Sequence, residues 1–331
     1  MQKSEQQVGE SDVQNFSISK IDISCEISFN FCLNILTLMR ENDKIIIVKY
    51  EGRKCFMENV IVDVKDVAGA YSSEIEKLGF SECGHLKDLD GVPTQKGGKL
   101  SIGLECLDRD LWDFDRAFPL IKALGIRRAR LQSGWQKTEQ VEGVYDFAWL
   151  DNQVDKLVSE GIDPFISLSY GNKLYCNNPE DCPQIDNGGV GHIPVVYENE
   201  RKAWQNYVRA TVTHFKDRVK YFEIWNEPDV INFCRCPQMT WPEAYMELVK
   251  LTAPIIREIL PEALIISCTA LATNTQLLFD MGLGDYVDIH SYHSYNAWPE
   301  LIGDSQANMM SYIKAKYPNL KFWRGEAGYP S

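Results

Sequence analysis

The chain has 331 residues, of which 44% are hydrophobic, and its formal net charge is −13 at pH 7. That length accommodates one large domain, or a large domain with a small additional one. The negative charge argues against nucleic acid and anionic membranes as partners. No apolar run is long enough to cross a membrane. Residues 1–20 are polar and acidic without a signal-peptide pattern, so we expect a cytoplasmic protein.

The first third of the chain has the period-two apolar pattern of β-strands. Residues 1–15 are polar, and we expect them to be disordered. Residues 84–97 are rich in Gly, Asp and Lys, which is typical of a linker. We therefore expect a β-rich accessory module with its linker over residues 16–97. Its predicted elements are strands near 18–25, Lys44–Tyr50 and Asn59–Val67, and a short helix near Ser72–Leu78.

From Leu100 onward, short strand patterns alternate with longer amphipathic helix patterns. The predicted strands are Leu100–Cys106, Ile126–Ser133, Pro164–Ser169, Val219–Asn226, Leu264–Thr269, Tyr286–Ser291 and Leu320–Glu326. The predicted helices are Asp113–Leu124, Asp146–Glu160, Glu198–Lys216, Trp241–Leu260, Thr275–Met281 and Ser305–Tyr317. This order predicts a (β/α)8 TIM-type barrel over residues 98–331.

The pattern supplies seven strands rather than eight, so the barrel is expected to be truncated after strand seven. We expect a fragment of a longer enzyme, with unpaired edges on the first and seventh strands. The alternative is a strand that the pattern hides upstream.

Charge alternation in strand two indicates which side faces the barrel interior. Ala129 and Leu131 point one way, and Arg128, Arg130 and Gln132 point the other. Helices cover the outside of a barrel, so the apolar side should face them. Buried guanidinium groups need carboxylate partners. The carboxylates that can reach the same interior are Glu105, Glu223, Glu227 and Glu326.

The most informative run is Trp225-Asn226-Glu227-Pro228, at the end of strand four. Aromatic and branched residues precede it, and Pro228 should terminate the strand because proline donates no ladder hydrogen bond. Pro228 should also bias Glu227 toward extended backbone. A carboxylic acid at a strand tip beside an amide is suited to general acid catalysis on a sugar.

A second glutamate, Glu326, ends strand seven in Lys321-Phe-Trp-Arg-Gly-Glu326. Two carboxylates on two strand tips fit the chemistry of glycoside hydrolysis. The alternative is that both are strand-end acids that cap the N-termini of helices. The acidic chain suits a neutral oligosaccharide or polysaccharide partner.

The segment from about Leu100 to the end resembles a clan A glycoside hydrolase, a (β/α)8 barrel. Within the clan it is most similar to family 39, which contains β-xylosidases and α-L-iduronidases. The motifs that carry the resemblance are Trp225-Asn226-Glu227-Pro228, Gly325-Glu326, Arg130-Leu131-Gln132 and the run from Asp288 to Tyr295. Two positions depart from the family: Gln132 where histidine is expected, and Gly325-Glu326-Ala327 where Thr-Glu-Phe is expected. These departures bear on the substrate rather than on the chemistry.

The resemblance implies a β-xylosidase-like retaining glycosidase that acts by double displacement without a cofactor. Glu326 would be the nucleophile, held ionised by Arg130, and Glu227 the acid and then the base. Asn226 would bind the sugar 2-hydroxyl. Tyr295 would donate a hydrogen bond to Glu326, with Tyr292 as the rival for that role. Gln132 and His293 are also expected in the sugar pocket; for His293 the alternative is a histidine whose hydrogen bonds are satisfied at a strand end. Five residues at strand tips or in loops are expected to form the sugar platform, with a packing role as the alternative for each: Trp135, Tyr170, Asn172, Trp298 and Trp323.

Four of the ten cysteines fall in two loops that should be neighbours on the catalytic face. They are Cys176 and Cys182 after strand three, and Cys234 and Cys236 after strand four. They could bind zinc, form disulfides or remain free thiols. Two other functions stay open. One is a metal-dependent hydrolase that uses these cysteines. The other is a non-catalytic carbohydrate-binding barrel, if truncation or loop changes have silenced the site.

Overall fold

The computed structural model describes four N-terminal strands and residues 101–295 and 303–328. The chain divides into two units, Met1–His85 and Leu86–Ser331. The described part of the first unit is an antiparallel sheet in the order β1-β2-β3-β4. Its strands are β1 (Ile27–Phe31), β2 (Asn34–Glu41), β3 (Lys44–Glu51) and β4 (Lys54–Asp63). The sequence pattern predicted β3 and the second half of β4, Asn59–Asp63, but missed β1 and β2. Predictions over 1–26, 64–67 and 72–78 lie outside the described residues.

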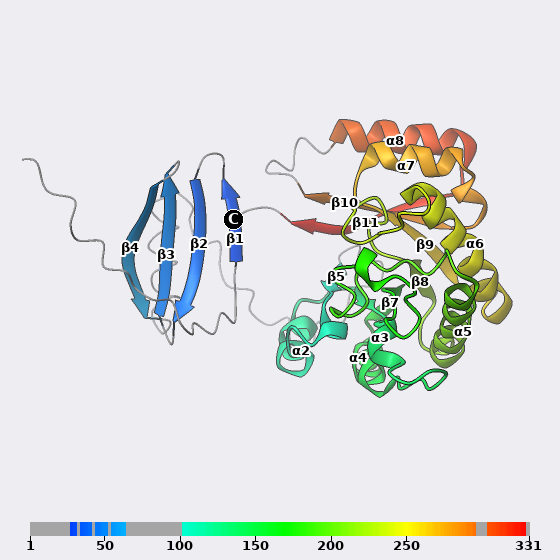
Figure 1. The fold of residues 1–331 in the computed structure, drawn as a ribbon, viewed down its shortest axis with the longest axis horizontal. Coiled ribbons are helices and arrows are strands. Elements are labelled where there is room, and N and C mark those ends of the chain that lie inside the picture. Colours follow the sequence, from blue (N-terminus) through cyan, green and yellow to red (C-terminus); the bar gives the residue numbers. More distant parts are fainter. Residues whose placement is uncertain are drawn as a thin grey trace, which may run out of the picture. The chain divides into compact units, whose positions relative to one another are not determined.

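The second unit is a curled sheet of seven parallel strands in the order β11-β10-β9-β8-β7-β6-β5, with helices around its outside (Figure 1). Each strand pairs with the next one along the chain, as in a TIM barrel. The fold class predicted from the sequence is therefore confirmed. The strands are β5 (Ser101–Leu104), β6 (Arg128–Gln132), β7 (Asp163–Leu168), β8 (Tyr221–Ile224), β9 (Leu264–Thr269), β10 (Ile289–Tyr295) and β11 (Lys321–Gly328).

Within the described residues, β5 and β11 each pair on one side only. The barrel is thus nearly closed but incomplete, one strand short of eight. This matches the prediction that the first and seventh strands carry edges.

Local sequence signals explain the helix boundaries. Asp113 caps α2 by accepting hydrogen bonds from the Asp115 and Arg116 amides. Thr240 and Glu243 form a capping box at the start of α6, where Pro242 occupies the first turn as predicted. The helices are α2 (Phe114–Ala123), α3 (Trp135–Thr138), α4 (Ala148–Ser159), α5 (Glu198–Phe215), α6 (Trp241–Ile259), α7 (Ala272–Asp280) and α8 (Gly303–Lys316). Short 3-10 turns occupy Leu107–Arg109, Pro179–Asp181 and Leu283–Asp285.

The apolar side chains lie in two layers. The large one packs the outer face of the strands against the helices, and Ala129 and Leu131 of β6 are fully buried in it. The small one, Phe165, Ile266 and Ile289, fills the barrel interior. The alternation predicted for strand two therefore holds, and the interior face of β6 is left for polar side chains. No helix in the described part of the chain is long and apolar enough to span a membrane.

Candidate active site

Glu227 lies in a strained turn just beyond β8. The strand ends at Ile224, and both Trp225 (φ 68°) and Glu227 (φ 44°) have left-handed backbone. The expectation that Pro228 keeps Glu227 extended is therefore wrong. Left-handed backbone costs a residue other than glycine on the order of 1–3 kcal/mol and is concentrated at functional sites. Here the turn is anchored by the Trp225 indole, which donates to the Phe233 carbonyl at 2.8 Å.

Glu326 reaches the barrel interior because β11 contains a bulge. Trp323 pairs with Ser291, whereas Glu326 pairs with His293, so Gly325 is the extra residue. Strict alternation would put Trp323 and Glu326 on opposite faces; the bulge puts both inside. A side chain at Gly325 would collide with the Ser291 hydroxyl, which explains the glycine.

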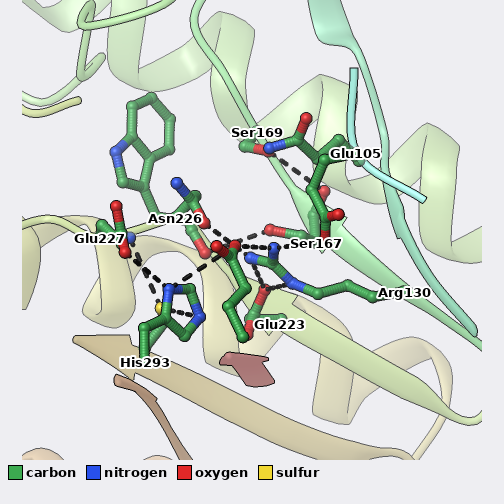
Figure 2. Close-up of polar contacts among 12 residues, drawn as sticks. Glu105, Arg130, Ser167, Ser169, Glu223, Asn226, Glu227 and His293 are labelled. Atoms are coloured by element: carbon green, nitrogen blue, oxygen red, sulfur yellow. Dashed lines mark hydrogen bonds and ion pairs between the residues drawn. The ribbon is translucent and has the colours of Figure 1, made fainter. Parts of the chain in front are cut away.

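Arg130 is the hub of the site (Figure 2). Its guanidinium, 1% exposed, donates to Glu105 at 3.0 Å, to Glu326 at 2.5 Å and to Glu223 at 2.7 Å. It also donates to Asn226 Oδ1 at 2.8 Å. Because one cation contacts three carboxylates, the carboxylates raise the pKa of Arg130 well above its usual value against the effect of burial.

The surroundings of Glu326 favour its ionised form. Burial alone would raise the pKa of Glu326, but Arg130, His293 and Tyr295 outweigh burial and lower it. The Tyr295 hydroxyl donates to Glu326 Oε2 at 2.7 Å. Tyr295 therefore makes the contact that the family resemblance implied, whereas Tyr292 packs against the outer apolar layer.

Glu227 and Glu326 lie on either side of His293. His293 Nδ1 is 2.8 Å from Glu227 Oε1 and 3.5 Å from Glu326 Oε1. The nearest carboxylate oxygens and the imidazole nitrogen all lie within 4.8 Å of one another. On its other side, His293 Nε2 is 3.3 Å from the buried Cys268 thiol. His293 thus connects the two candidate catalytic acids.

Asn226 and Gln132 are fixed by a shared partner, the Tyr170 hydroxyl. Asn226 Nδ2 donates to it at 2.8 Å and Gln132 Nε2 at 3.4 Å. Gln132 Oε1 accepts from Arg109 at 2.7 Å. Tyr170 is fully buried, and burial raises its pKa far above the usual value, so it stays a neutral hydroxyl. These amides are therefore held in place beside Arg130.

Three predicted sugar contacts lie elsewhere. Trp135, 0% exposed, begins α3 and stacks on Tyr175 and Tyr207 within the outer apolar layer. Asn172 is fully buried and donates to the Glu139 carbonyl at 2.8 Å. Both expectations are corrected: these side chains pack and do not face the glutamates.

Trp323 lies at the opposite end of the barrel from the glutamates. It contacts Phe165 and Tyr221, which lie near the starts of β7 and β8, and the Arg128 guanidinium stands 5.0 Å from its ring. The expectation that Trp323 binds sugar is therefore corrected as well. Trp298 lies outside the described residues.

Glu105, Arg109 and Cys268 belong to the site but were not assigned to it from the sequence. Only Glu105 gave a signal: it was expected among the carboxylates that reach the interior, and it pairs with Arg130. Burial raises the pKa of Glu105, and its two charged neighbours act in opposite directions, Arg130 lowering it and Glu326 raising it. Arg109 and Cys268 carry no motif, because the contacts that place them come from distant strands.

The four loop cysteines are free thiols. Within the part of the chain that the structure describes, two groups could hold a metal ion: Glu223, Cys268 and His293, and Glu227, His293 and Glu326. Neither group includes a loop cysteine. Both share His293 with the site already described.

The central part of the barrel resembles a known enzyme family. Residues 120–272 match the family profile described as glycosyl hydrolases family 39. This segment belongs to glycoside hydrolase family 39. It contains Arg130, Asn226, Glu227 and Cys268, whereas His293 and Glu326 follow it along the chain.

Individual relatives of this chain are distant. A 6-phospho-beta-glucosidase of Clostridium longisporum is 23% identical over 182 residues, which cover 53% of this chain and 35% of that protein. A beta-xylosidase of Geobacillus stearothermophilus is 24% identical over 133 residues, which cover 37% of this chain and 24% of that protein. The chain thus spans about a third or less of these relatives' lengths.

Among solved structures, the GH39 enzyme from Xanthomonas axonopodis pv. citri superimposes with a TM-score of 0.53 at 22% identity. The match covers 70% of this chain and 51% of that one. At this identity the likeness establishes the barrel fold and nothing further about this chain.

Proposed function

We propose that this chain is a retaining O-glycosidase with a β-xylosidase-like preference. The observation that carries the proposal is the pair Glu227 and Glu326, whose nearest oxygens lie within 4.8 Å across His293. Retaining enzymes hold their carboxyl groups about 5–5.5 Å apart, too close for a water between them, whereas inverting enzymes need about 6.5–9.5 Å.

The two carboxyls differ in surroundings as their two roles require. Glu326 contacts Arg130 and Tyr295, which favour its charged form, so it is the nucleophile that attacks the anomeric carbon. Glu227 has no arginine or lysine among its ion-pair partners in the described residues, and it contacts His293. Because Glu227 lacks such a cation, we assign it as the acid that delivers a proton to the leaving oxygen.

After the leaving group departs, Glu227 accepts a proton from water, which hydrolyses the glycosyl ester on Glu326. Asn226 binds the sugar 2-hydroxyl. Its Nδ2 carries two N–H groups, and Tyr170 takes one of them, so a second is free to donate. The Arg130 bond to Asn226 Oδ1 fixes the direction of that donor.

The xyloside preference rests on the family 39 segment and on the beta-xylosidase among the relatives. Gln132 bears on this preference, because its amide takes the place expected for histidine and is bonded to Arg109.

A panel of nitrophenyl glycosides tests the proposal, with Glu326→Gln as the matched inactive variant. We expect hydrolysis of the β-xyloside to exceed that of the other sugars and to fall by at least about a thousandfold in Glu326→Gln. Binding of xylo-oligosaccharides with no turnover of any aryl glycoside would instead favour a carbohydrate-binding barrel. Turnover that Glu326→Gln leaves unchanged would reject this site.

A further inference from the structure

A second cluster of reactive side chains lies in the loop between β7 and α5. A small pocket there is lined by Cys176, Cys182, His192, Glu200 and Arg235. None of these residues takes part in the candidate active site. The pocket brings two thiols, an imidazole and a carboxylate together.

The two thiols line the same small pocket and differ in access. Cys176 is half-buried, whereas Cys182 is only 3% exposed. A reagent from solution therefore reaches Cys176 first, and Cys182 is the thiol next to it in the pocket.

His192 gives the pair a positive neighbour. It is 5% exposed, neither ring nitrogen has a partner in hydrogen-bond geometry, and Nε2 lies at ion-pair distance, 3.4 Å, from Glu200 Oε1. Burial opposes a charge on His192, but contacts with Cys176 and Glu200 outweigh burial and raise its pKa. The neighbouring Cys182 thiol, with help from His192, lowers the pKa of Cys176. The reactive form of a thiol is the thiolate, so these contacts activate Cys176.

We propose that Cys176 and Cys182 form a dithiol site that reacts with low-molecular-weight disulfides to give an intramolecular disulfide. The Cys176 thiolate attacks one sulfur of the small disulfide, forms a mixed disulfide and releases one small thiolate. Cys182 then loses its proton and attacks the Cys176 sulfur, which releases the second small thiolate. The two protein thiols are oxidised, the small disulfide is reduced to two thiols, and their protons come from Cys176 and Cys182.

The neighbouring cysteines fit this reaction less well. Cys234 is 2% exposed, and burial raises its pKa to about 12. Burial also raises the pKa of the half-buried Cys236. The Cys176–Cys182 pair is therefore the nucleophilic one.

The test treats the whole protein with 2-hydroxyethyl disulfide, alkylates the remaining thiols and digests with trypsin. Cleavage after Lys173 and Arg201 gives one peptide that contains Cys176 and Cys182 and no other cysteine. We expect this peptide to take two alkyl groups before treatment and none after it, with the loss of two hydrogens. Cleavage after Glu180 should leave its two halves joined until a reductant is added.

Variants separate the two steps. Cys182→Ser should stop at a mixed disulfide on Cys176, and Cys176→Ser should slow the reaction of the peptide by at least about tenfold. His192→Asn should slow the first step at neutral pH by roughly tenfold. Cys236→Ser, which removes a half-buried thiol from the next loop, should react like the parent protein.

Three results would overturn the proposal. One is a treated peptide that still takes two alkyl groups. Another is a disulfide that joins Cys176 to Cys234 or Cys236. The third is stoichiometric zinc whose removal by a chelator is needed before either thiol reacts.

Discussion

Arg130 Nη1 lies 2.5 Å from Glu326 Oε1, which joins β6 to the edge strand β11 across the barrel interior. The same guanidinium also holds Glu223, whose side chain is fully buried. Arg130 therefore orients the candidate nucleophile and compensates a buried carboxylate. A change at Arg130 should therefore affect both the stability of the fold and the proposed catalysis.

Arg130→Met should lower both stability and activity. The change leaves Glu223 buried without its cation, which costs on the order of 3–5 kcal/mol in the free energy of unfolding. Arg209→Met is the control, because its exposed pair with Glu258 contributes at most about 1 kcal/mol. Urea denaturation of both variants measures the difference. Equal midpoints for the two variants would contradict the role of Arg130.

Tyr295→Phe should move the acid limb of kcat/KM to higher pH. The Tyr295 hydroxyl stabilises ionised Glu326 and lowers its pKa, so its loss raises that pKa, and activity is lost sooner as pH falls. A hydrogen bond to a charged group contributes about 1.5–3 kcal/mol, so kcat/KM should fall roughly ten- to hundredfold.

Tyr312→Phe is the matched control for that change. It removes a tyrosine bond of the same length, 2.7 Å, to Asp280 between α8 and α7. Its pH profile should match that of the parent. If the acid limb of kcat/KM lies at the same pH in Tyr295→Phe as in the parent, the ionisation of Glu326 does not determine that limb.

Gly325→Ala should disturb the bulge that aims Glu326 inward. The new Cβ meets the Ser291 hydroxyl, and overpacking of this kind costs typically about 1–3 kcal/mol. A nucleophile displaced by about 1 Å loses on the order of a hundredfold in rate. The double variant Gly325→Ala, Ser291→Ala removes the colliding oxygen and should recover most of the rate. If the double variant is no better than the single one, the collision is not the cause.

Glu227→Ala and Glu326→Ala should differ in kind. Without Glu227, an activated aryl glycoside still glycosylates Glu326, and azide restores turnover because a small anion replaces the missing base. Without Glu326, no glycosyl-enzyme accumulates. Burst kinetics and the mass of the intact protein separate the two cases. The acid assignment is lost if Glu227→Ala hydrolyses unactivated substrates at the parent rate.

The sequence predicted the strands and the two glutamates because both signals are local. Strand periodicity can be recognised within each short strand, and the Trp-Asn-Glu-Pro run directly surrounds Glu227. The β11 bulge was not readable, because it depends on the register with β10. The left-handed backbone of Glu227 was missed for the same reason: the turn is set by contacts with Phe233 and Cys268.

Aromatic residues were the least predictable part of the site. Trp135 follows a strand, as a sugar-binding tryptophan would, but Gly134 (φ 56°) turns the chain into α3 and buries the indole. Trp323 lies on the interior face of β11. Because it precedes Glu326 by three residues along the strand, it lies at the other end of the barrel. Position along a strand decides between packing and binding, and composition alone does not show it.

The stereochemistry of hydrolysis tests the central claim most directly. Proton NMR of the first-formed sugar, recorded before mutarotation, reports which anomer the enzyme releases. One carboxylate oxygen of Glu227 and one of Glu326 lie within 4.8 Å of each other, which is shorter than the separation of about 6.5–9.5 Å that an inverting attack by water requires. We expect a β-xyloside to give β-xylose first. Release of the α-anomer first would contradict the double displacement and the role of Glu326 as nucleophile.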